Sequence, residues 1–133
     1  MTKLHFQPIR DKAPYIIDTI LQAEEMASLG VVWQAIHLVT EELVVNVASY
    51  AYPDGADDYL DVEIIRDEGH ITLRFRDGGV PFNPLEREAP DTTLPIEERP
   101  IGGLGIYLVR QFMDTVEYEY TNGENILTVM KKV

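Results

Sequence analysis

The sequence predicts an α+β two-layer sandwich, in which helices cover one face of a mixed, largely antiparallel sheet. Two observations support this fold class. The first half of the chain carries apolar residues at helical spacing, whereas two later segments alternate apolar and polar residues on both sides of a turn. With 133 residues, the chain is long enough to bury a core as one domain spanning residues 1–133.

The first half of the chain predicts a short strand and two helices. Residues 3–9 predict the strand, and residues 13–30 predict a helix that ends at Gly30, since glycine suits a helix C-cap. Residues 31–52 predict a second, stronger helix that stops before Pro53. Its apolar stripe consists of Val32, Ile36, Val39, Leu43, Val47 and Tyr50.

The second half predicts two hairpins separated by an irregular segment. Residues 59–77 alternate around a turn at residues 67–69, and residues 115–132 flank Asn122-Gly123, a strong hairpin signal. The intervening residues 81–100 hold five of the eight prolines and show no hydrophobic period. A long irregular segment inside a domain predicts a functional loop, which we interpret as a lid before the last helix.

Composition excludes several functional classes. A net charge of −12 argues against binding a nucleic acid backbone. The longest stretch without a charged residue, residues 26–40, is too short and too polar to span a membrane. There is no cysteine for disulfides or thiolate metal sites, and the first ten residues lack the apolar core of a secretory signal. We therefore expect a cytoplasmic protein.

One candidate site lies on the second predicted helix. Glu42 and Asn46 are four residues apart, so their side chains lie on the same side of the helix, beside its apolar stripe. Glu41 points towards water instead. Asn46 could offer its carbonyl oxygen to a hard cation while Glu42 acts as a base, or both could be ordinary polar residues at the edge of the core. The helix alone leaves both interpretations open.

A second candidate site follows a predicted strand. Asp77-Gly78-Gly79 places a carboxylate at the strand end, followed by glycines that allow a ligand to approach the backbone. Such a stretch is typical of a pocket floor, but it is also typical of a simple Asp-Gly turn.

A third candidate site is a glycine turn that precedes the helical pattern of residues 106–114. The N-terminus of a helix exposes unpaired N–H groups and is a suitable anion site. No Lys-Ser or Lys-Thr pair follows these glycines, so the P-loop pattern is absent. The turn consists of Gly102, Gly103, Leu104 and Gly105.

The order of these motifs resembles that of the histidine kinase-like (GHKL) ATPase superfamily, whose fold is the Bergerat fold. The motifs are Glu42-x-x-x-Asn46, Asp77-x-Gly79, a variable lid, and Gly103-x-Gly105. Within that superfamily, "EELVVNVASYAYP", "DGGVPFNPLE" and "EERPIGGLGIYLVRQFMD" are most similar to the bacterial anti-sigma factor serine/threonine kinases, also called anti-sigma regulatory factors. The similarity covers nearly the whole chain.

The resemblance implies a role for each motif residue. Asn46 matches the asparagine that binds the Mg²⁺ bridging the ATP phosphates, and Glu42 matches the proposed catalytic base. Asp77 matches the aspartate that accepts a hydrogen bond from the adenine amino group, which selects ATP over GTP. Gly79 matches the glycine beneath the base. The cofactors implied are ATP and Mg²⁺.

The resemblance also implies an ATP lid over residues 84–103. The amides that hold the phosphates belong to Gly103, Leu104 and Gly105, and we include Phe82 among the nucleotide-binding residues. Arg99 lies near the position of a phosphate-contacting arginine in related kinases, although two extra residues, Pro100 and Ile101, blur that alignment. A solvated lid residue is the equal alternative for Arg99.

The function implied is that of a kinase in a partner switch. Such a kinase phosphorylates a STAS-domain anti-anti-sigma antagonist and sequesters a sigma factor. The acidic surface suits a protein partner better than nucleic acid, we expect no membrane, and homodimers are common in the family. Two alternatives remain: an ATP-gated binding module without kinase turnover, and a serine kinase in a STAS-linked pathway without a sigma factor.

Overall fold

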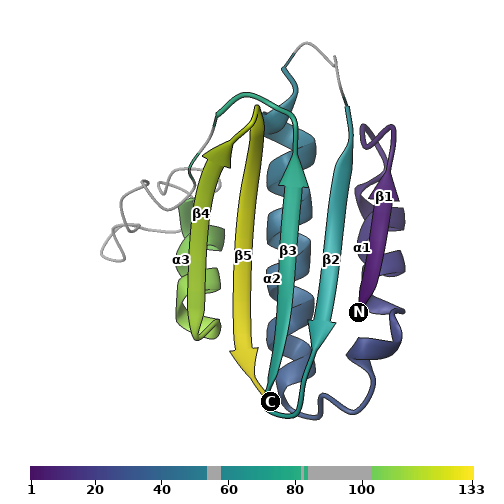
Figure 1. The fold of residues 1–133 in the computed structure, drawn as a ribbon, viewed down its shortest axis with the longest axis vertical. Coiled ribbons are helices and arrows are strands. Elements are labelled where there is room, and N and C mark those ends of the chain that lie inside the picture. The colour runs from purple at the N-terminus through teal and green to yellow at the C-terminus, as the bar shows by residue number, and fades with distance from the viewer. Residues whose placement is uncertain (54–57, 82, 84–102) are drawn as a thin grey trace.

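The computed structural model describes residues 1–53, 58–81, 83 and 103–133. Figure 1 shows one five-stranded sheet with the helices packed on a single face. The strands are β1 (Thr2–Phe6), β2 (Leu60–Arg66), β3 (His70–Asp77), β4 (Thr115–Thr121) and β5 (Glu124–Lys132). The helices are α1 (Ala13–Leu21), a 3₁₀ turn η1 (Glu24–Met26), α2 (Val32–Asn46), a π-helical turn η2 (Val47–Ala51) and α3 (Gly103–Phe112).

The sheet has the strand order β1-β2-β3-β5-β4, and each of its four pairings is antiparallel. Both predicted hairpins are confirmed. In the second hairpin, Asn122 and Gly123 adopt positive φ angles of 53° and 79°, which this type of tight turn requires. The predicted α+β two-layer architecture with helices on one face is therefore confirmed.

The core lies between the sheet and the helical layer. Alternate residues of β3 face the helices, because side chains of a strand point to opposite faces in turn. Three of these residues, Ile71, Leu73 and Phe75, are buried and apolar, and the fourth is Asp77. From α2, the predicted stripe residues Ile36, Val39 and Leu43 are buried against them.

The predicted helix over residues 13–30 is too long. The helix α1 ends at Leu21, and the chain continues through η1. Tertiary hydrogen bonds hold this segment to the sheet: the carboxylate of Glu25 accepts from the hydroxyl of Thr2, and Arg66 donates to the carbonyls of Glu25 and Ala27. These contacts replace the hydrogen bonds that a longer helix would have made.

The predicted helix over residues 31–52 is present, but its last turn is the π-helical η2. A π turn accommodates an extra residue, so the side chains after Asn46 are rotated relative to the α-helical stripe. Tyr50, which the helical spacing placed on that stripe, is consequently 38% exposed. The next residues, Ala51 and Tyr52, are buried at the end of the sheet instead.

Among the parts of the chain that the structure describes, none of the helices combines the length and the apolar character needed to cross a membrane.

Candidate functional site

A pocket lies where the end of α2 meets the ends of the central strands β3 and β5. It contains about 460 Å³ of space, part of which is open to solvent. Apolar side chains dominate its wall, with a few polar groups among them. The lining residues are Leu43, Asn46, Val47, Ala51, Phe75, Asp77, Tyr118, Asn125 and Leu127.

Asp77 is the carboxylate of this pocket and is only 5% exposed. Its Oδ1 accepts two hydrogen bonds, from the backbone N–H of Gly79 at 2.9 Å and from Nδ2 of Asn125 at 3.0 Å. Its Oδ2 has no hydrogen-bond partner among the described residues. Burial raises the pKa of Asp77, although the two hydrogen bonds act in the opposite direction. The carboxylate is therefore oriented, and one oxygen remains available to a ligand.

Asn125 is a site residue that the sequence motifs did not reveal. Its Nδ2 donates to Asp77 and also, at 2.8 Å, to the carbonyl oxygen of Val80. Because the carboxylate of Asp77 and the carbonyl of Val80 only accept, the amino end of the amide faces them, and its Oδ1 accepts from the hydroxyl of Tyr118. A signal was present: Asn125 begins an inward-facing row that continues with Leu127 and Val129. A polar residue in such a row requires a partner, and its register partner in β3 is Asp77.

Gly79 is held against the end of the helical layer. A Cβ atom at this position would lie 2.2 Å from the carbonyl oxygen of Ala51, a distance that no side chain can occupy. The neighbouring residue, Val80, donates its backbone N–H to that same oxygen at 2.9 Å. Glycine is required here by the close approach of two backbone segments. That the nucleobase packs above Gly79 stays a prediction.

The two polar residues of α2 differ in their relation to the pocket. Asn46, the last residue of α2, is half-buried and lines the pocket. Glu42 lies one turn earlier, is also half-buried, and is not among the lining residues. Glu41 points to solvent as predicted: its side chain is 49% exposed, and its Oε1 lies 2.8 Å from Nε2 of His37.

The glycine turn begins α3. The helix starts at Gly103, so Leu104 and Gly105 fall in its first turn, where backbone N–H groups have no helical partner. The predicted helix after the glycines is confirmed, whereas phosphate binding by its amides stays a prediction. Phe82, Arg99 and the predicted lid up to residue 102 lie outside the described residues.

The pocket thus unites Asn46 from α2 with Asp77 from β3, beside a glycine-mediated backbone contact. A family model for the histidine kinase-like ATPase domain matches residues 18–131, which include all of these groups. The chain belongs to the histidine kinase-like ATPase family. The resemblance in the motifs is confirmed by this match, which covers most of the chain.

Several relatives of this ATPase domain are named as protein kinases. The serine/threonine-protein kinase BtrW of Bordetella bronchiseptica is 25% identical over 92 residues, which make up 69% of this chain and 65% of BtrW. The serine-protein kinases RsbW of Bacillus thuringiensis and Listeria monocytogenes are 28% and 27% identical over 94 residues, or 68% of this chain. Those residues make up 58% and 60% of the two RsbW proteins, so the match covers less than two thirds of each relative.

Proposed function

We propose that this histidine kinase-like ATPase domain binds ATP with Mg²⁺ and transfers the γ-phosphoryl group to a serine hydroxyl of a partner protein. The observation that carries the proposal is the pocket itself. An oriented carboxylate, Asp77, lies in an apolar wall, and the amide of Asn46 lines the same space. An adenine base fits such a wall, and its amino group gives Asp77 a hydrogen-bond donor.

The direction of that hydrogen bond determines which base is preferred. The exocyclic amino group of adenine donates, whereas guanine carries a carbonyl oxygen at the same position, which only accepts. A carboxylate also only accepts when it is ionised. Asp77 therefore favours ATP over GTP, because a guanine carbonyl facing its carboxylate would leave two buried acceptors without a donor.

The triphosphate would extend from the pocket towards α2 and α3. The side-chain carbonyl oxygen of Asn46 is a hard donor of the kind that Mg²⁺ accepts, and Mg²⁺ commonly takes most of its other ligands from phosphates and water. When bound, the ion would neutralise part of the phosphate charge. The backbone amides of Gly103, Leu104 and Gly105 would supply further donors at the N-terminus of α3. Both contributions would offset repulsion from a chain of net charge −12.

The transfer step would require Glu42. Its carboxylate would accept the proton of the incoming serine hydroxyl while the serine oxygen forms a bond to the γ-phosphorus. The bond between that phosphorus and the bridging oxygen of ADP breaks in the same step, and ADP leaves. Glu42 lies one helical turn from Asn46. This position would place the catalytic carboxylate near the phosphates of the nucleotide rather than near its adenine ring.

We propose a STAS-domain antagonist as the phosphorylated partner and a sigma factor as the sequestered one, in a cytoplasmic partner switch. The names of the relatives as serine-protein kinases support the reaction type. The alternatives are an ATP-gated binding module without turnover and a serine kinase in a STAS-linked pathway without a sigma factor. We also propose that residues 1–133 form a single domain and that the protein forms a homodimer.

Calorimetric titration with ATP, with and without Mg²⁺, tests nucleotide binding, and GTP is the control. We expect binding of ATP that is strengthened by Mg²⁺ and is tighter than binding of GTP. Incubation with radiolabelled ATP and a STAS-domain protein then separates the kinase from the binding module. An absence of binding at millimolar ATP would overturn the proposed function.

Asp77→Asn is expected to weaken ATP binding by about 10- to 100-fold, because a hydrogen bond to a charged group contributes roughly 1.5–3 kcal/mol. If the Asn carbonyl keeps the bonds from Gly79 and Asn125, its amino group faces the adenine amino group, donor against donor. Calorimetry with ATP and GTP would show a smaller preference for ATP. Unchanged affinity would show that Asp77 does not contact the base.

The same variant has an expected pH signature. Burial raises the pKa of Asp77, so the folded protein binds this proton more tightly than the unfolded chain does. The contribution of Asp77 to stability therefore falls as pH rises above about 4, the usual pKa of an Asp. Urea unfolding across this range should show that decline in the wild type and less of it in Asp77→Asn. Parallel pH profiles would contradict this account.

A further inference from the structure

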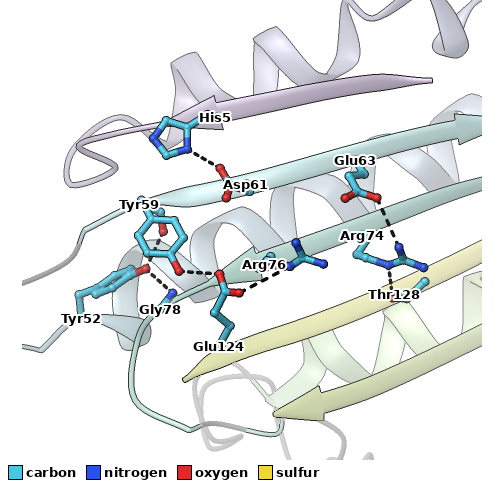
Figure 2. A network of polar contacts seen from close by, with 10 residues as sticks. All are labelled: His5, Tyr52, Tyr59, Asp61, Glu63, Arg74, Arg76, Gly78, Glu124 and Thr128. Atoms are coloured by element: carbon cyan, nitrogen blue, oxygen red, sulfur yellow. Dashed lines mark hydrogen bonds and ion pairs between the residues drawn. The ribbon is translucent and has the colours of Figure 1, made fainter. Parts of the chain in front are cut away.

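A network of hydrogen bonds reaches the loop that follows Asp77, and Figure 2 shows how Tyr52 lies between Tyr59 and Gly78 in it. The hydroxyl of Tyr52 donates to the backbone carbonyl of Tyr59 at 2.7 Å and accepts from the backbone N–H of Gly78 at 2.7 Å. Tyr52 is only 8% exposed, and it directly follows the π-helical turn at the end of α2. Tyr52 lies in the stretch EELVVNVASYAYP that carries the family resemblance, but no role was assigned to it above.

Each of three successive N–H groups in this loop has one specific acceptor. The N–H of Gly78 donates to the Tyr52 hydroxyl, that of Gly79 to Asp77 Oδ1 at 2.9 Å, and that of Val80 to the Ala51 carbonyl at 2.9 Å. Tyr52 therefore holds the residue before Gly79, and Ala51 holds the residue after it, so the two flank the hydrogen bond from Gly79 to Asp77. The direction of the Asp77 carboxylate depends on where the Gly79 N–H lies, so it depends on both of these anchors.

We propose that Tyr52 is a positioning residue for nucleotide recognition: its hydroxyl fixes the Gly78 amide and thereby the direction of the Asp77 carboxylate. The proposal deepens the proposed function and rests on it. A phenol has one proton and accepting lone pairs, so donating to Tyr59 and accepting from Gly78 are compatible. Burial raises the pKa of Tyr52 to about 12, and the hydroxyl therefore keeps its proton under physiological conditions.

Tyr59 provides a matched comparison within the same network. Its own hydroxyl donates to Oε2 of Glu124 at 2.6 Å, while only its backbone carbonyl accepts from Tyr52. Replacing Tyr59 by phenylalanine would remove the contact to Glu124 and leave the Tyr52–Gly78 hydrogen bond in place. Tyr52→Phe would instead leave the Gly78 N–H without its acceptor and the Tyr59 carbonyl without its donor. Each variant loses a single hydroxyl and retains its aromatic ring.

Both variants are compared with the wild type by calorimetry with ATP and GTP, well below their thermal unfolding midpoints. We expect Tyr52→Phe to weaken ATP binding about tenfold and to reduce the ATP-to-GTP preference, because one unsatisfied buried polar group typically has an effect of this size. Tyr59→Phe should stay within about twofold of the wild type. A merely structural role would lower the unfolding midpoint and leave the ATP-to-GTP preference unchanged, and that result would overturn the proposal.

Amide hydrogen exchange without nucleotide provides an independent readout. Exchange at Gly78 should become faster in Tyr52→Phe and remain as in the wild type in Tyr59→Phe. Unchanged exchange at Gly78 would overturn the proposal, whatever the binding data show. If the wild type binds no ATP, the proposed function fails by itself, and the exchange experiment still decides whether Tyr52 holds this loop.

Discussion

Glu42→Gln is expected to reduce phosphotransfer to a STAS-domain protein by about 10²- to 10⁴-fold, the usual contribution of a general base. Glutamine keeps the shape of the side chain and removes its ability to take the serine proton. ATP affinity should stay within about twofold of the wild type, because Glu42 is not among the residues that line the pocket. Single-turnover transfer from radiolabelled ATP measures the rate, and calorimetry measures the affinity.

The neighbouring carboxylate provides the control for this experiment. Glu41 carries the same charge on the same helix, but it faces solvent and lies beside His37. Glu41→Gln should therefore leave both the transfer rate and the ATP affinity close to those of the wild type. If Glu42→Gln transfers phosphate as fast as Glu41→Gln does, Glu42 is not the base. Comparable losses in both variants would indicate a general effect of charge on this helix.

Gly79→Ala is expected to destabilise the domain by about 1–3 kcal/mol or more, the range for inserting a methyl group into a closely packed site. The new Cβ would lie 2.2 Å from the Ala51 carbonyl oxygen, and this neighbour is backbone rather than a flexible side chain. The loop would have to move away from residue 51, which would also displace the Gly79 N–H from Asp77. Urea unfolding should show the lost stability, and calorimetry should show ATP affinity reduced by at least about tenfold.

Gly69 supplies the matched glycine for this test. It lies in the turn between β2 and β3, and nothing would lie within 4 Å of an added Cβ there. Gly69→Ala should change the free energy of unfolding by no more than about 0.5 kcal/mol, as surface substitutions usually do. Equal stability of the two variants would show that the Gly79 loop can relax without cost. Full ATP affinity in Gly79→Ala would show that this loop does not set the position of Asp77.

The features that the sequence predicted correctly depend on local patterns. Alternating residues in the two hairpins, and the Asn122-Gly123 pair between strands, reflect preferences that operate over a few residues. The buried stripe of α2 follows from helical spacing alone, as does the outward direction of Glu41. Of the predicted site residues, Asn46 and Asp77 were found together in one pocket, because their motifs mark the ends of elements that meet there.

The features that the sequence did not reveal depend on contacts between distant segments. The end of α1 at Leu21 reflects hydrogen bonds from Thr2 and Arg66 to the following residues, and no local pattern encodes them. The π-helical turn that brings Ala51 to Gly79 is a change in helical geometry without a clear residue signal. Asn125 becomes a site residue only through its register with Asp77, which lies 48 positions earlier.

The position of β5 between β3 and β4 has a consequence for how the pocket arises during synthesis. A nascent chain that has produced residues 1–121 contains α2 and the strands β1 to β4, but it lacks the strand that joins β3 to β4. Asn125 and Leu127, which line the pocket, belong to that missing strand. Pairings between segments so far apart in the sequence form slowly compared with local ones. If the domain binds ATP as proposed, binding should therefore begin only after residues 124–132 have left the ribosome and paired with β3.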